Sequence, residues 1–194
     1  VIEKFGKGIE LVQKALNTKG IEDKKYGETY KLMADFSLPI NNILLGYAAS
    51  STSLDTLLFY KNLQTMTDAL HNELKYTKVE KGEYGNEAYL KAKKLNLAQS
   101  GRFFIYAAQF LASSNKPELA LQAYDKAISY GKDYPEIADM LEMPIGEAQI
   151  AYYAFHTAHD AKMYDAMDKY YDKAIQFADG AEGTQQVKIL SYLS

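Results

Sequence analysis

Two histidines and an aspartate in the C-terminal half of the chain are the residues best suited to chemistry. His156 and His159 stand three residues apart in a segment with helical periodicity, so their side chains share one face, and Asp160 follows directly. Two imidazoles and a carboxylate are ligand types that Zn²⁺ accepts. The rest of a ligand set is missing, and polar side chains on an exposed helix face are ordinary. We therefore expect no metal at this pair.

The common catalytic motifs are absent from the sequence. It contains no G-x-G-x-x-G, no phosphate-binding loop, no G-x-S-x-G and no H-E-x-x-H. Cysteine is also absent, which excludes disulfides, thiolate nucleophiles and cysteine-ligated zinc. We expect no catalytic residues, no cofactor and no enzymatic activity.

Tyrosine is the second group with chemical potential, because the chain has 17 of them. A tyrosine ring offers a large contact area and one hydroxyl at a small entropic cost, so exposed rings suit a platform for sugars or peptides. Most of these rings are expected to serve packing instead. Spacing places Tyr124 and Tyr171 at core positions, where we expect equivalent buried wedges, whereas Tyr152 is expected on an exposed face.

Composition argues against two classes of partner. The chain has 22 lysines and arginines against 25 aspartates and glutamates, and it has no basic stripe that could neutralise phosphates. We do not expect it to bind nucleic acid. The longest apolar runs, 43–49 and 103–108, are far shorter than the ~20 residues of a membrane helix, so the chain is not expected to span a membrane.

Two parts of the chain repeat each other 47 residues apart. The pentapeptide Tyr-Asp-Lys-Ala-Ile occurs at 124–128 and again at 171–175, and Tyr-Ala occurs at 106–107 and again at 153–154. Both pairs align without a gap. Self-similarity at a period of about 20–50 residues is typical of stacked repeats, in which each unit buries one face against its neighbours.

Each copy of the repeat predicts a pair of helices. In the first copy, small and apolar residues recur at helical spacing in two stretches that the break 113–117 separates. Pro117 suits the first turn of the second helix, and Gly131 suits the position just after its end. The residues on the facing sides are Phe104, Ala107, Ala108 and Leu111 in the first stretch and Ala120, Tyr124 and Ala127 in the second.

This pattern resembles the tetratricopeptide repeat over residues 101–178. That family has a large apolar or aromatic residue, then small residues, then a final alanine at these offsets. The second copy departs from the pattern at Phe155, Met167 and 162–163, where small or turn residues are usual, and neither copy has the terminal proline in place. The resemblance implies an all-α fold: an α/α right-handed superhelix of antiparallel helix pairs.

The resemblance also implies where a partner binds. Members of this family mostly bind peptides on the concave face, through the first helix of each pair. Carrying those positions over gives Ile105 and Ala112, together with six polar or aromatic residues: Arg102, Gln109, Gln149, Tyr152, His156 and His159. The lysine and asparagine pattern with which some relatives clamp a C-terminal carboxylate is missing, so a chaperone-tail site is not expected.

Periodicity predicts about nine helices in the whole chain. Before the repeats they cover 2–16, 24–36, 39–49 and 54–77, and the cap-forming residues 50–53 precede the last of these. Residues 86–113 predict either one long helix or two that break at 100–101, and 131–144 predicts a turn around 137–141. The polar connection 78–85 predicts a boundary between a divergent N-terminal half, 1–82, and clearer helical pairs, 83–194, in one continuous domain.

The two ends of the chain suggest a piece of a longer array. The first residue is valine rather than methionine, and Val187, Leu190 and Leu193 give the last segment, 185–194, an apolar face. We expect that a following element covers this segment or that it self-associates. The lack of cysteine favours export slightly, so a periplasmic or envelope-associated location is expected over a cytoplasmic one.

The predicted function is that of a protein-interaction scaffold, which binds a segment of another protein or a peptide on its concave helical face. Two alternatives stay open. One is a helical small-ligand carrier or enzyme whose pocket is closed by 21–77, and the other is a structural spacer in a larger envelope-associated protein. An open face with exposed Gln109, Tyr152 and His156 favours the scaffold, whereas a closed apolar pocket with converging polar groups favours the carrier or enzyme.

Overall fold

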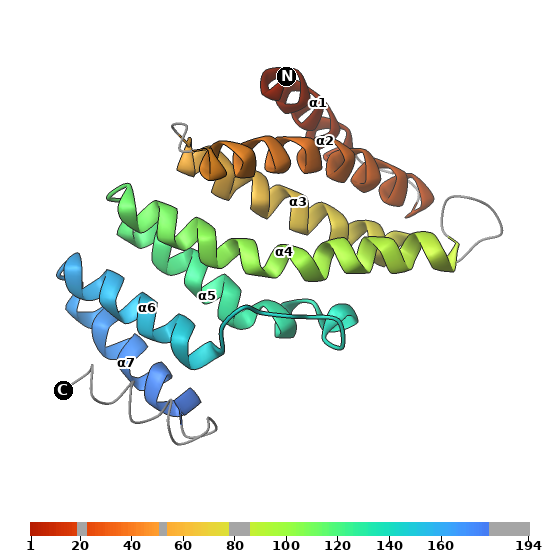
Figure 1. Ribbon diagram of the computed structural model, residues 1–194. Helices are drawn as coiled ribbons and strands as arrows, with labels where there is room; N and C mark the ends of the chain where they lie inside the picture. Colours follow the sequence, from red (N-terminus) through yellow and green to blue (C-terminus); the bar gives the residue numbers. More distant parts are fainter. Residues whose placement is uncertain (19–22, 51–53, 78–85, 179–194) are drawn as a thin grey trace. The chain divides into compact units, whose positions relative to one another are not determined.

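The computed structural model describes residues 1–18, 23–50, 54–77 and 86–178. Every regular element in these ranges is helical, which confirms the predicted all-α class (Figure 1). The α-helices are α1 (Ile2–Leu16), α2 (Asp23–Ala49), α3 (Thr56–Tyr76), α4 (Glu87–Ser113), α5 (Pro117–Asp133), α6 (Glu147–Asp160) and α7 (Tyr164–Ala178), and η1 (Pro135–Ile137) is a turn of 3₁₀-helix. None of these helices is both long and apolar enough to cross a membrane.

The chain divides into two compact units. Unit 1 consists of Val1–Ser100 with Tyr134–Leu141, and unit 2 consists of Gly101–Asp133 with Glu142–Ser194. The long helix α4 therefore contributes residues to both units. The boundary predicted near residue 82 falls in 78–85, which is outside the described residues.

Helix α2 passes through Pro39 without a break, so the prediction of two separate helices there was wrong. Proline removes one helical hydrogen bond, the one to the carbonyl of Asp35. One face of α2 is buried on both sides of the proline, from Met33 to Leu44. Asn62 of α3 also donates a side-chain hydrogen bond to the carbonyl of Ser37 at 3.0 Å. Packing against α3 along its whole length therefore outweighs the local preference to end the helix.

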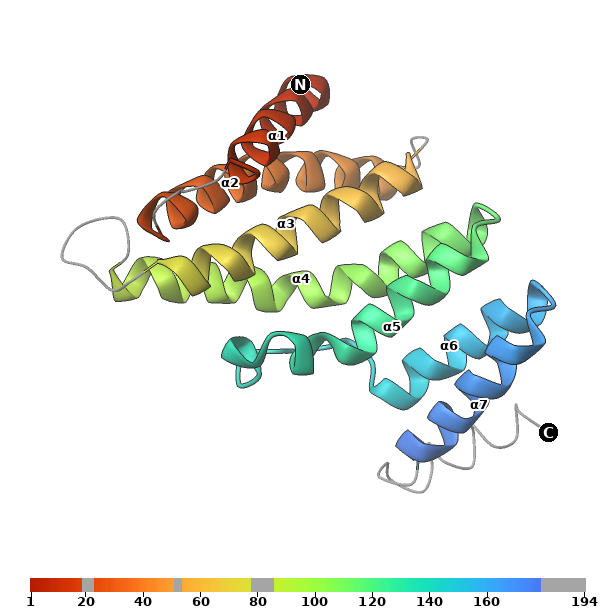
Figure 2. The same cartoon turned by 180° about the vertical axis from the view of Figure 1, so that it is seen from behind.

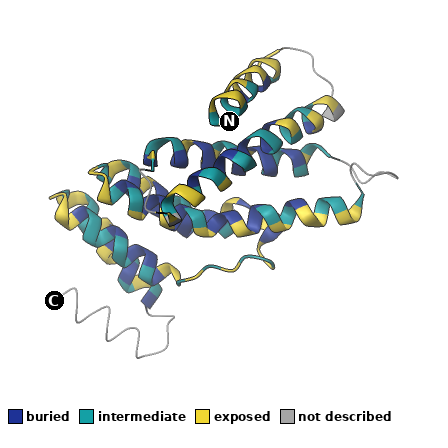
Figure 3. Cartoon of the chain, turned by 45° about the horizontal axis from the view of Figure 1, so that its top comes forward, coloured by how far each residue is buried: buried dark blue, intermediate teal, exposed yellow. Residues whose placement is uncertain are grey.

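Helices α3 and α4 supply the rest of the core of unit 1. The side chain of Asp55 caps α3 by accepting a hydrogen bond from the backbone N–H of Leu58 at 2.9 Å. Ten of the 21 residues of α3 are buried, and Figure 3 colours buried residues dark blue. Helix α4 is uninterrupted, which decides between the two predicted alternatives (Figure 2). Its Ser100 hydroxyl donates to the carbonyl of Asn96 at 2.7 Å, within the helix.

Helices α1 and α2 approach closely at a glycine. A Cβ atom at Gly8 would lie 2.9 Å from two ring carbons of Phe36, whereas a Cβ at Gly6 would meet nothing within 4 Å. Gly8 therefore lets the aromatic ring of α2 lie against the backbone of α1. The Phe36 ring also contacts Phe5, with a centroid separation of 6.2 Å.

This contact predicts opposite effects of the same substitution two residues apart. Gly8→Ala should destabilise the protein by about 1 kcal/mol, because overpacking against Phe36 outweighs the better helix propensity of alanine. Gly6→Ala should stabilise it by up to about 1 kcal/mol, because only the propensity changes. Urea denaturation of both variants measures the difference, and equal changes would contradict the close approach.

Unit 2 contains two helical hairpins with the same turn: the part of α4 from Gly101 onward pairs with α5, and α6 pairs with α7. Asn115 and Lys162 have positive φ angles, 55° and 57°, and they stand 47 residues apart. The backbone N–H of Lys116 bonds to the carbonyl of Leu111, and the N–H of Met163 bonds to the carbonyl of Ala158, both at 2.9 Å. This is the Schellman pattern of a helix C-terminus. The sequence repeat is therefore also a repeat of backbone geometry.

The shared turn predicts a stabilising substitution. Lysine in the left-handed region is strained, whereas asparagine tolerates that region and glycine adopts it freely. Lys162→Gly should therefore raise the free energy of unfolding by about 0.5–1 kcal/mol, and Asn115→Gly should raise it less. Thermal denaturation of the two variants checks this order, and the reverse order would contradict it.

The segment between α5 and α6 packs in unit 1. We call this segment, Tyr134–Leu141, the strap. Tyr134 and Ile137 are buried, and Glu136 Oε1 lies 2.6 Å from Nδ1 of His71 on α3. The strap turns through η1 and a backbone hydrogen bond from Met140 to Ile137, close to the predicted turn. Helix α5 continues to Asp133, so the prediction that it ends before Gly131 was wrong.

Candidate functional site

All six predicted partner-binding residues lie in unit 2. Arg102 and Gln109 are exposed on α4, and Arg102 lies over the ring of Phe103 at 5.3 Å. The other four follow each other at helical spacing along α6, where Gln149, Tyr152 and His156 are half-buried and His159 is exposed. Gln149 donates a hydrogen bond to the Tyr153 hydroxyl at 3.2 Å.

Rings from α6 and α7 form one contact network, which we call the aromatic cluster. Phe155 is at its centre, with ring centroids 5.5 Å from His156, 6.4 Å from His159 and 6.4 Å from Tyr171. Tyr152 meets His156 edge-on at 4.4 Å, the closest ring pair of the five residues. Such edge-to-face geometry is favourable between aromatic rings. The cluster consists of Tyr152, Phe155, His156, His159 and Tyr171.

His156 has an unusual polar atom. Its Nε2 is buried but makes no hydrogen bond with any group of the described residues. A buried polar atom without a partner costs about 1–3 kcal/mol, and each one in a folded protein requires an explanation. A ligand that supplies a hydrogen bond to Nε2 would offset this cost.

The two histidines of the cluster have different partners. His156 contacts Tyr152 and Phe155, whereas His159 Nδ1 lies 3.3 Å from the carboxylate of Asp160. In the part of the chain that the structure describes, no three His, Cys, Asp or Glu side chains gather as metal ligands. The cluster is therefore a group of ring contacts that contains one buried polar atom, Nε2 of His156.

Tyr124 and Tyr171 are not equivalent, although both begin the repeated pentapeptide. Tyr124 is 2% exposed, as predicted, but Tyr171 is 38% exposed, so the prediction of a buried wedge at Tyr171 was wrong. One reason lies on the partner helix. The first hairpin has Ala108 at the position where the second has Phe155, and the Phe155 ring lies beside Tyr171 with a centroid separation of 6.4 Å.

Tyr170 takes the buried place on α7 instead. Its hydroxyl donates a hydrogen bond to the carbonyl of Leu121 on α5 at 3.2 Å. Asp125 of α5 accepts hydrogen bonds from Lys169 at 2.5 Å and Lys173 at 2.8 Å. Burial raises the pKa of Asp125, but hydrogen bonds from both lysines and Tyr170 outweigh it and leave the pKa below its ordinary value. These contacts fix the orientation of α7.

Unit 1 contains a charge network around a buried glutamate that the sequence did not reveal. Glu73 on α3 is 0% exposed, and its Oε2 lies 3.2 Å from Nζ of Lys93 on α4. Lys93 also lies 3.4 Å from Asp35 on α2, which pairs with Lys31 at 2.5 Å. The Tyr89 hydroxyl donates to Glu73 Oε1. We call Lys31, Asp35, Glu73, Tyr89 and Lys93 the charge network.

The protonation of Glu73 follows from this position. Burial raises its pKa, and the hydrogen bond from Tyr89 and the charge of Lys93 only partly oppose that effect, so the pKa is above its ordinary value. Oε2 has the ion pair but no well-aligned hydrogen bond. A sequence signal existed, because Glu73 stands three residues after Leu70 on the apolar stripe of α3 and Lys93 lies between Leu90 and Leu97.

Comparisons with known proteins found no match for this chain. No family model matches the chain, and neither the curated proteins nor the solved structures include a significant match. The described residues define an all-α protein whose unit 2 consists of two helical hairpins with a common turn.

Proposed function

We propose that the protein is an interaction scaffold, with hairpins that are tetratricopeptide-like pairs stacked in a right-handed superhelix. The repeated left-handed turns at Asn115 and Lys162 support the repeat architecture. In this proposal a segment of another protein binds along α6, at Tyr152, His156 and His159, with Arg102 and Gln109 of α4 as further contacts.

The observation that carries this proposal is the buried, unpaired Nε2 of His156 within the aromatic cluster. The rings of Tyr152 and Phe155 beside it offer apolar area, and the Gln149 amide offers a further polar contact. A peptide provides both kinds of group, because its backbone supplies a hydrogen-bonding group and its side chains cover the rings. An unpaired buried group in the free protein favours the bound state, since binding removes its penalty.

The proposal predicts that one substitution separates stability from binding. His156→Phe keeps a ring in place and removes the unpaired nitrogen, so the free protein should be as stable as the parent or more stable. The same variant should lose at least tenfold in affinity for the partner, because the hydrogen bond to Nε2 is gone. Gln122→Ala, on the exposed side of α5, is the matched control and should bind normally.

The measurement begins with immobilised full-length chain, the Gln122→Ala variant and the His156→Phe variant exposed to the same extract. Proteins retained by the first two and lost from the third are then titrated against each chain by calorimetry. Equal affinity of the His156→Phe variant and the parent would refute the proposed site.

A further inference from the structure

The repeated pentapeptide has two different environments. In the first copy, on α5, Tyr124 is 2% exposed and Ile128 is 7% exposed. In the second copy, on α7, Tyr171 is 38% exposed and Ile175 is half-buried. The side chains are the same and their spacing is the same. Besides Phe155 opposite Tyr171, the two copies differ in what covers each helix.

Helix α6 covers the first copy. It packs on α5, and the Thr157 side chain is hydrogen-bonded to the hydroxyl of Tyr124. Burial raises the pKa of that hydroxyl to about 12, while the Thr157 hydrogen bond lowers it and the nearby Tyr153 raises it further. In a stack of repeats, each hairpin covers the one before it. The corresponding surface of the second copy, on α7, is therefore where a further element would pack.

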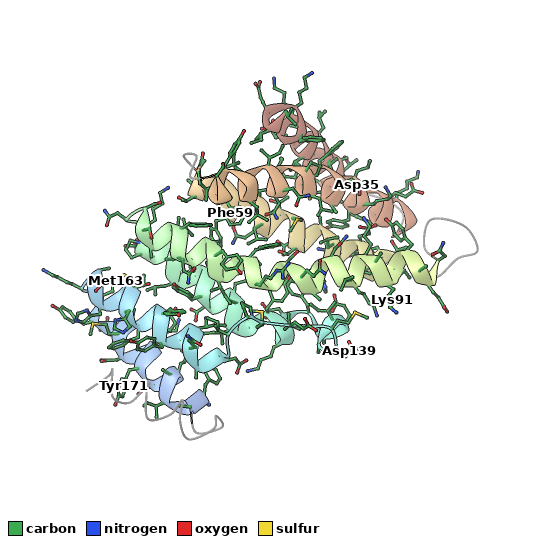
Figure 4. All side chains as sticks on the ribbon, in the orientation of Figure 1. Asp35, Phe59, Lys91, Asp139, Met163 and Tyr171 are labelled. Carbon is green, nitrogen blue, oxygen red and sulfur yellow. The ribbon has the colours of Figure 1, made fainter. Side chains whose placement is uncertain are left out.

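This surface runs along α7. Residues separated by three, four or seven positions lie on one side of a helix, so four apolar or aromatic side chains form a single row. We call this row the open face: Tyr164, Met167, Tyr171 and Ile175. Tyr164 is exposed, and together with Met163 it lines a surface depression of about 400 Å³ at the start of the helix. Figure 4 labels Met163 and Tyr171 at this hairpin.

We propose that the chain's own last segment, 185–194, docks on the open face. These residues lie outside the described part of the structure, so their match to the open face is inferred from the sequence. Val187, Leu190 and Leu193 recur every three residues and form an apolar stripe that matches the row on α7. Lys188 is the one charged residue of the segment, and the exposed carboxylates Asp168 and Asp172 flank the open face.

The length of the connection favours this occupant over a separate molecule. Residues 179–184 follow α7 directly and contain Gly180 and Gly183, which suit a reversal of the chain. Six residues reach about 20 Å when extended, which is enough to bring the stripe back along α7. A tethered segment also has an effective concentration of about a millimolar or more. The open face shares Tyr171 with the aromatic cluster, but the proposal does not depend on the partner site on α6.

The absence of native cysteine makes disulfide trapping in the full chain a direct test. Tyr171→Cys is combined in turn with Val187→Cys, Leu190→Cys and Leu193→Cys, because a disulfide forms only when the Cα atoms approach within about 7 Å. The control series replaces Tyr171→Cys with Gln176→Cys, an exposed position about 140° away around α7. At dilute protein concentration, at least one Tyr171 pair should form an intramolecular disulfide tenfold or more faster than its Gln176 counterpart.

Other results would overturn the proposal. Equal rates for the two series would mean that the segment has no preferred site, and disulfide-linked dimers in the Tyr171 series would mean that a second copy covers the open face. Amide exchange adds a readout without cysteines, since Leu190→Glu should accelerate exchange across α7 at least tenfold and Gln186→Glu should not. No acceleration in the Leu190 variant would contradict docking even if the cysteine variants failed to fold.

Discussion

Lys93→Met is expected to destabilise the protein by about 3–5 kcal/mol, because it leaves the carboxylate of Glu73 buried without its cation. Glu73 is fully buried and has Lys93 at 3.2 Å, while Asp35 and Lys31 complete the network from α2. Replacing both partners with apolar residues removes the uncompensated charge. The double variant Glu73→Leu/Lys93→Met should therefore lose far less stability than the sum of the two single losses.

Urea denaturation of the four proteins gives the coupling energy between the two residues. Lys61→Met, on the exposed side of α3, is the control for removing a lysine and should change stability little. Single losses that simply add in the double variant would show that the ion pair has no coupling.

Glu73 also predicts a pH dependence. Its pKa is raised in the folded state, so the native protein binds more protons than the unfolded chain between the unfolded and folded values. The contribution of Glu73 to stability is therefore greatest below that window, falls as pH rises through it, and is constant above it. In the Glu73→Leu/Lys93→Met variant this slope should disappear. Unfolding free energies measured from pH 4 to 8 test the sign, and a slope that rises with pH in the parent and vanishes in the double variant would contradict it.

Tyr124→Ala is expected to cost about 3 kcal/mol or more, because it removes a fully packed ring and leaves a cavity between α5 and α6. Tyr124→Phe keeps the ring and loses only the hydrogen bond with Thr157, so it should cost about 1 kcal/mol. Tyr106→Ala is the matched control, since Tyr106 is exposed on α4 and its removal should cost much less.

Thermal and urea denaturation of the three variants establish the order. For a domain of this size, a loss of 3 kcal/mol lowers the melting temperature by roughly 6–12 °C. A Tyr124→Ala protein that melts within a degree or two of the parent would mean that the ring does not fill the space between the hairpins.

The sequence predicted the elements whose signals are local. Helix α1 begins and ends where its apolar periodicity does, and the break predicted at 113–117 contains the turn at Asn115. The predicted break of α2 at Pro39 was wrong. That prediction considered the helix-breaking tendency of proline and did not consider the packing of α2 along α3. Propensity is a weak prior when a whole face of a helix is buried.

For the candidate site, the sequence predicted which residues share a helix face and nothing beyond that. Spacing on α6 identified Tyr152, His156 and His159 as one row, but it could not show that Phe155 meets both histidines and lies beside Tyr171. The repeat register gives a residue's place on its own helix and does not give the size of the side chain opposite. The charge network was harder to predict from the sequence, because its members come from three helices that are distant in sequence.

The strap has a consequence for how the chain reaches its fold during synthesis. Unit 1 is complete only when Tyr134 and Ile137 are buried and Glu136 has reached His71, yet these residues follow the whole of α5. A ribosome therefore releases the first 100 residues, and then the first hairpin of unit 2, before unit 1 can close. A nascent chain that stops at Asp133 therefore leaves His71 and Asp68 of α3 without their contacts to Glu136 and Tyr134 of the strap.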